Sequence, residues 1–150
     1  MIRAFVVCAF LFLFVGVAVP QQQTSVQSIT LVFATRQNAK PWNAQVRATI
    51  KCAGQTMATL QCCSGDRKRD QWAAGSSHFR NMQMAQPLPR VALTGCTFEL
   101  GMDAPKSSRW TVSPTLRVFY NNSATKVRSF DDTTLVSAGG YTAKSFGLDF

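Results

Sequence analysis

Short stretches in which apolar and polar residues alternate are the feature that most limits the possible folds of this chain. Between residues 44 and 53 (AQVRATIKCA) the even positions are apolar, and the odd positions include Arg47, Thr49 and Lys51. A period of two residues is typical of a β-strand with one buried face and one wet face. No segment carries a helical period longer than two turns, so the chain is expected to be all-β.

Further strands are predicted at 25–34, 56–63, 76–84, 87–100 and 109–122, with short candidates at 126–130 and 133–137. Pro114 inside the segment 109–122 predicts an edge strand, or two short strands with a bend, because proline has no N–H for a ladder. Residues from about 123 to the end are rich in Gly, Ser, Thr and Asp and are expected to form a C-terminal tail. Seven or eight short strands separated by turn signals predict an antiparallel β-sandwich.

The N-terminus has the pattern of a secretory signal peptide. Arg3 precedes a run from Ala4 to Val19 without a polar residue, and Gly16 and Ala18 put small residues where a peptidase would cut. The run is shorter than the roughly 20 residues of a membrane-spanning helix. We therefore expect a signal peptide at 1–18, a secreted domain at 19–150 and no transmembrane segment after cleavage.

The domain left after cleavage has four cysteines, Cys52, Cys62, Cys63 and Cys96. An even number in an exported domain predicts two stabilising disulfides. Neighbouring cysteines are expected to bond to different partners. One of the adjacent pair would then bond to Cys52 and the other to Cys96, in an order that the sequence leaves open. A tight hairpin of 44–53 and 56–63 would not allow this, so either the two strands lie in different sheets, which is the preferred interpretation, or the turn between them is irregular.

The charge balance predicts anionic partners. The chain carries a net charge of +9, and removal of residues 1–18 takes away Arg3 alone, which leaves +8. Acidic glycans, phospholipid head groups, acidic proteins and nucleic acid are the candidates, and export makes nucleic acid the least expected. Five charges fall within SGDRKRDQW (64–72), which is interpreted first as a solvated turn, second as an anion-contacting loop and third as a processing site.

Tryptophans near these charges suggest a binding surface. Trp42 follows Pro41 between two predicted strands, so it belongs to a loop, and a loop tryptophan beside cations suits a membrane interface or a sugar face. Trp72 and Trp110 can also be interpreted as core residues. The candidate binding residues are Lys40, Trp42, Arg67, Lys68, Arg69 and Trp72.

The sequence offers no pattern for catalysis. His78 is the single histidine, there is no G-x-S-x-G, and no pair of acidic residues suits a two-carboxylate site. One histidine and an oxidising compartment also argue against zinc. We expect no enzyme, no cofactor and no metal. Asn121, in the triplet NNS, is a glycosylation acceptor if the source is a eukaryote.

Four segments resemble the PLAT (lipoxygenase-homology) β-sandwich family: WNAQVRATI (42–50), AGSSHF (74–79), PLPRVAL (87–93) and MDAPKSSRWTVS (102–113). The resemblance spans residues 29 to about 120; four cysteines, sparse loop acids and the tail depart from the family pattern. It implies a non-catalytic module that binds lipids or proteins through loop aromatics, with Trp42 at the matching position beside Lys40.

Taken together, the patterns predict a secreted, non-catalytic binding module that contacts an anionic lipid or an acidic glycan. The alternative is a secreted effector, inhibitor or toxin-like protein with a specific protein partner.

Overall fold

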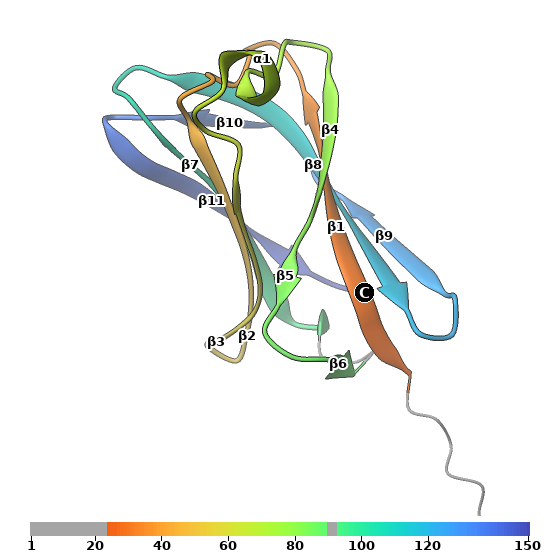
Figure 1. Cartoon of the computed structure of the whole chain (residues 1–150). Helices are drawn as coiled ribbons and strands as arrows, with labels where there is room; N and C mark the ends of the chain where they lie inside the picture. Colours follow the sequence, from red (N-terminus) through yellow and green to blue (C-terminus); the bar gives the residue numbers. More distant parts are fainter. Residues whose placement is uncertain (1–23, 90–92) are drawn as a thin grey trace, which may run out of the picture.

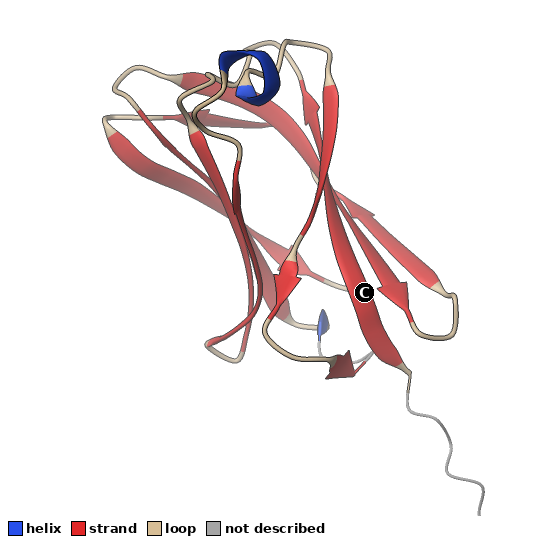
Figure 2. Cartoon of the chain, in the orientation of Figure 1, coloured by secondary structure: helices blue, strands red, loops and turns tan. Residues whose placement is uncertain are grey.

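The computed structural model describes residues 24–89 and 93–150. The predicted signal peptide at 1–18 lies outside the described residues. Two antiparallel sheets pack face to face as a β-sandwich (Figures 1 and 2). The predicted fold class is therefore confirmed.

In the six-stranded sheet, β10, β8, β1 and β4 lie side by side, β6 also pairs with β1, and β9 also pairs with β8. The five-stranded sheet has the order β11-β7-β2-β3-β5. The first sheet comprises β1 (Ser25–Thr35), β4 (Ser77–Asn81), β6 (Leu88–Pro89), β8 (Arg109–Tyr120), β9 (Thr125–Ser129) and β10 (Thr133–Val136). The second comprises β2 (Gln45–Cys52), β3 (Gln55–Cys62), β5 (Gln83–Met84), β7 (Cys96–Ala104) and β11 (Gly140–Leu148). A single helical turn, α1 (Arg67–Asp70), lies between β3 and β4.

The alternation in β2 orients its two faces as predicted. Val46, Ala48 and Ile50 are at most 1% exposed, in the core between the sheets, while Arg47 and Thr49 are half-buried on the outer face. Burial of side chains such as those of Val46 and Ile50 contributes about 1.5–3 kcal/mol each. The polar residues between them are thereby fixed on the outer surface of the five-stranded sheet.

The expectation that 44–53 and 56–63 belong to different sheets is wrong. β2 and β3 form a hairpin in the five-stranded sheet, with pairs from Val46↔Cys62 to Cys52↔Gln55. Ala53 and Gly54, between the strands, have φ angles of 49° and 79°. Positive φ at both central residues is what a type I′ hairpin turn requires.

The expected disulfide partners are also wrong. Cys52 bonds to Cys96, and Cys62 bonds to its neighbour Cys63. The hairpin places Cys52 beside the start of β7, where its Cα lies 4.4 Å from that of Cys96. Cys63 has a φ of 75°, so it leaves the strand, and its side chain need not point to the face opposite Cys62 as in a regular strand.

β8 is a continuous strand with partners on both sides, so it is neither an edge strand nor two bent pieces. It pairs with β1 on one side and with β10 and β9 on the other. Pro114 lies between the stretches that pair with β10 and β9, and its carbonyl accepts from Phe130 N at 3.0 Å. The missing N–H of Pro114 therefore faces the gap between these two short strands.

The predicted C-terminal tail is folded. Its two short candidates form β9 and β10. A further strand that was not predicted, β11, pairs with β7 from Gly140↔Ala104 to Leu148↔Cys96. The predicted strand 87–100 is also divided, into β6 and the first part of β7. The described residues contain eleven strands; the count exceeds the prediction because of β11 and of β5 and β6, which have two residues each.

Candidate functional site

The stretch SGDRKRDQW folds as a capped helical turn at one end of the sandwich (Figure 1). Asp66 is the N-cap residue, and its carboxylate accepts from the backbone N–H of Lys68 at 2.9 Å and of Arg69 at 3.3 Å. An aspartate in this position satisfies donors that would otherwise lack partners in the first turn of a helix. One of the two acidic residues is therefore used to hold the backbone of the turn.

The second acidic residue, Asp70, is buried, with 2% of its surface exposed. Its carboxylate accepts from Asp66 N at 3.0 Å and from Arg69 Nε at 3.3 Å. Burial raises the pKa of Asp70, but these hydrogen bonds and the charges of Arg69 and Lys40 outweigh it and lower the pKa below its usual value. The carboxylate thus stays ionised behind the turn.

The three basic side chains between these acids are exposed. Arg67, Lys68 and Arg69 follow one another in α1 and all face solvent; we call them the cationic turn. Arg69 is paired with Asp70. The guanidinium carbon of Arg67 lies 5.1 Å from the ring centroid of Trp42, which is half-buried in the loop between β1 and β2. The structure thus places four of the six predicted binding residues at the surface of this end of the molecule.

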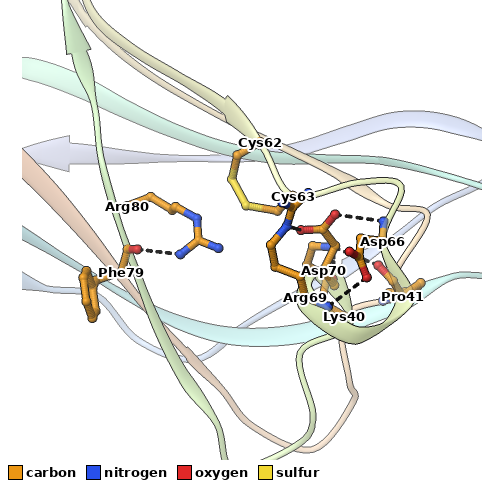
Figure 3. Close-up of a disulfide and its surroundings, with 9 residues drawn as sticks. All are labelled: Lys40, Pro41, Cys62, Cys63, Asp66, Arg69, Asp70, Phe79 and Arg80. Atoms are coloured by element: carbon orange, nitrogen blue, oxygen red, sulfur yellow. Dashed lines mark hydrogen bonds and ion pairs between the residues drawn. A yellow bond between two sulfur atoms is a disulfide. The ribbon is translucent and has the colours of Figure 1, made fainter.

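The prediction that Lys40 is a surface cation is wrong. Lys40 is fully buried, and its ammonium donates to the carbonyls of Pro41 at 2.8 Å and Asp70 at 2.7 Å (Figure 3). Its backbone forms a bridge with Trp72. Burial lowers the pKa of Lys40 to about 8. Lys40 therefore anchors the end of α1 to the loop that precedes β2.

Trp72 is not a surface residue either, and the core interpretation weighed for it is correct. It is fully buried and stacks on His78 with ring centroids 4.5 Å apart. Its ring also packs against Phe33 and Trp110 at 5.1 and 5.6 Å. Its Nε1 has no hydrogen-bond partner among the described residues. The sequence alone does not show whether Trp72 is buried or exposed, because the charged run before it fits either position.

The Cys62–Cys63 disulfide lies where β3 ends and the cationic turn begins (Figure 3). Both cysteines are half-buried. Arg80 extends from β4 beside it, with Nη1 donating to Phe79 O at 2.8 Å and the guanidinium carbon 5.7 Å from the Trp72 centroid. The disulfide thus precedes the turn, and the hydrogen bond from Lys40 to Asp70 O holds the end of the turn.

His78, on β4, lies between Ser76 and the Trp72 ring. Its Nε2 is 3.0 Å from the hydroxyl of Ser76, and its ring stacks on Trp72. Burial, followed by the charges of Arg80 and Lys40, lowers its pKa. In the part of the chain that the structure describes, no three His, Cys, Asp or Glu side chains are grouped as metal ligands would be.

Asn121 lies outside the site, in the turn between β8 and β9. It is exposed, and its Oδ1 accepts from Ser25 N at 3.1 Å. Glycosylation at this position stays a prediction.

No family model, curated protein or solved structure matches this chain. The resemblance to the PLAT family therefore stays a hypothesis. Of the helices formed by the described residues, none has the length and apolar character needed to cross a membrane.

Proposed function

We propose that this chain is an exported, non-catalytic binding module that docks on anionic lipid surfaces through the cationic turn. One observation supports this most. The two acidic residues of the turn are used for capping and internal pairing, while Arg67, Lys68 and Arg69 project outward. A rigid turn of this kind loses little conformational freedom when it meets a surface.

Trp42 supports the same proposal. Its ring lies beside Arg67 at the same end of the sandwich and is partly accessible. Tryptophan is favoured at the head-group level of membranes, where one part of the ring is dry and the other wet. In this proposal the guanidinium contacts phosphate while the indole edge enters the interface.

The electrostatic contribution can be estimated. A basic residue close to an anionic leaflet contributes about 1 kcal/mol. Arg67 and Lys68, which form no ion pair among the described residues, give about 2 kcal/mol, enough for roughly a thirtyfold preference over neutral lipid. The remaining net charge of the protein adds long-range attraction.

The test is co-sedimentation with vesicles of phosphatidylcholine alone or mixed with phosphatidylserine. Arg67→Glu/Lys68→Glu should reduce binding to the mixed vesicles at least tenfold. Arg117→Glu/Lys126→Glu is the matched control, since it makes the same charge change at exposed residues of β8 and β9. Equal binding to both vesicle types, or an equal loss in both variants, would reject the proposal. Retention on a heparin column with no vesicle binding would point to an acidic glycan instead.

The alternative of a specific protein partner is favoured by a different surface. Phe79, on β4, is 71% exposed, more than any other large apolar side chain of the described residues, and aromatic side chains are enriched in protein interfaces. Phe79→Ser should abolish a stoichiometric protein complex and leave vesicle binding unchanged. A partner whose binding is indifferent to this substitution would remove the support for this surface.

A further inference from the structure

A cleft opens beside β3, on the side of the five-stranded sheet that faces β4 and β5. β5 pairs with β3 only at Ala58↔Met84 and Thr59↔Gln83. β4, which precedes β5 in the chain, pairs with β1 in the other sheet. β3 and β4 therefore diverge beyond the β3–β5 pairs (Figure 1). The cleft has a volume of about 490 Å³, within the range of small-molecule sites. Its lining consists of Arg47, Thr49, Thr59, Leu60, Gln61, Asn81 and Gln83.

The lining is rich in neutral hydrogen-bonding groups. Among residues 24–89 and 93–150, no side-chain hydrogen bond engages Thr49, Thr59, Gln61 or Gln83. Two hydroxyls and two amides therefore keep their capacity to both donate and accept. Asn81, by contrast, already accepts from the Thr30 hydroxyl at 2.8 Å.

The charge of the cleft is largely neutralised. Arg47, its one cationic residue, pairs through Nη2 with Asp103 at 3.1 Å and donates through Nε to Gln45 at 3.1 Å. The cationic turn differs from the cleft, because its Arg67 and Lys68 are exposed and form no ion pair among the described residues. An anionic ligand therefore gains little here from electrostatic attraction.

An aromatic ring lies next to the cleft on the same face of the sheet. The guanidinium carbon of Arg47 is 5.5 Å from the ring centroid of Tyr141. This ring lies against Gly101, where an added Cβ would collide with it, and Tyr141 donates to Glu99 at 2.9 Å. It is 47% exposed. Gly101 lies against this ring and the Arg47 guanidinium lies over it, so Arg47 separates the ring from the cleft.

From these groups we infer that the cleft binds a neutral oligosaccharide. Each sugar hydroxyl both donates and accepts, as do the free hydroxyls and amides of the cleft, and a sugar carries no charge that would require a counter-charge. An extended peptide on β3 would need pockets for its alternate side chains. The lining offers one apolar residue, Leu60, which does not supply them.

The test is a titration of the whole secreted chain with neutral hexasaccharides of glucose, mannose and N-acetylglucosamine, followed by backbone amide NMR. At least one sugar should shift the amides of Thr59, Gln61 and Gln83. Gln61→Ala/Gln83→Ala should weaken its binding about tenfold, because two amides lose their hydrogen bonds. Gln55→Ala, an exposed glutamine at the start of β3 outside the cleft, is the matched control.

Three results would overturn the inference: no shift with any neutral sugar, a shift that the cleft variant leaves unchanged, or binding of peptides alone. The variant Arg67→Glu/Lys68→Glu keeps this test separate from the proposed lipid function. It should bind the neutral sugar as the natural chain does, whether or not vesicle binding is observed. Unfolding curves of the cleft variant should match those of the natural chain, since both glutamines are exposed.

Discussion

Trp72 and Trp110 touch each other in the core, but their indole N–H groups differ. Trp110 donates to the hydroxyl of Thr35 at 3.2 Å, whereas Trp72 Nε1 has no partner among the described residues. A buried donor without a partner costs about 1–3 kcal/mol. The two tryptophans therefore allow a comparison of two buried indole rings of the same size, of which only one has a hydrogen bond.

We expect Trp72→Phe to destabilise the fold less than Trp110→Phe, by about 1–2 kcal/mol. Both substitutions remove similar volume, but the first removes an unsatisfied group and the second leaves the Thr35 hydroxyl without its donor. Urea unfolding of both variants measures the difference. An equal loss, or a greater loss for Trp72→Phe, would contradict the assignment of these hydrogen bonds.

Lys40 should make stability depend on alkaline pH. Burial lowers its pKa from 10.5 to about 8 in the folded chain, so between these values the unfolded state holds the proton and the folded state does not. Stability then rises with pH across this window. Relative to Lys40→Met, the natural chain should gain roughly 2–3 kcal/mol between pH 8 and 10.5. A difference that stays constant across this window, in paired unfolding curves, would show that Lys40 keeps an ordinary pKa.

At the scale of elements, the two disulfides have different consequences for the unfolded chain. Cys52–Cys96 joins β2 to β7 across a sequence separation of 44, whereas Cys62–Cys63 joins neighbours. A crosslink stabilises mainly by limiting the unfolded ensemble, and more so for a longer loop. The first should matter for global stability and the second for the local shape of the chain at the start of the cationic turn.

Cys52→Ala/Cys96→Ala should therefore lower the free energy of unfolding by about 4 kcal/mol. Cys62→Ala/Cys63→Ala should lower it by less than about 1 kcal/mol, since almost no loop is closed. Urea unfolding under non-reducing conditions tests both. A global loss in the second variant as large as in the first would contradict this division.

The sequence could predict the elements whose signals are local. The alternation of β2 depends only on neighbouring residues, and its two faces lie as expected. The place of Pro114 in the sheet could not be predicted locally, because the gap that tolerates its missing N–H lies between β9 and β10, which follow later in the chain. β11 was missed because a composition rich in Gly and Ser is typical of loops, although β7 supplies it with a full ladder.

The candidate site could be predicted only in part for a related reason. Arg67, Lys68 and Arg69 are exposed because their own charged run makes them so. Lys40 is buried because the Asp70 carbonyl, thirty residues later, accepts from its ammonium. No local pattern encodes that partner. The cleft was not predicted at all, since it forms where β3 and β4, from different sheets, diverge.

At the scale of the whole molecule, the basic residues are distributed over both sheets as well as the cationic turn. Lys51, Arg117, Lys126 and Lys144 are exposed on β2, β8, β9 and β11. A net charge spread in this way steers encounters with anionic partners but does not choose an orientation. The cationic turn is distinguished by being local and held.

Binding to vesicles with phosphatidylserine should therefore fall as salt rises, because the screening length shortens from about 10 Å at 0.1 M to about 3 Å at 1 M. The decrease of vesicle binding with salt concentration should be less steep for Arg67→Glu/Lys68→Glu than for Arg117→Glu/Lys126→Glu. Co-sedimentation across a salt series measures both slopes. Identical slopes would assign the attraction to the total charge of the molecule.

The segment that contains β4 and β5 has a mechanical consequence. Residues 77–81 are laddered to one layer and residues 83–84 to the other, with Met82 buried between them. Strands that switch layers make the corners of such folds. If one sheet slid over the other, the hydrogen bonds of β4 with β1 or those of β5 with β3 would have to break. The cleft between β3 and β4 should therefore keep the same width with or without a bound ligand.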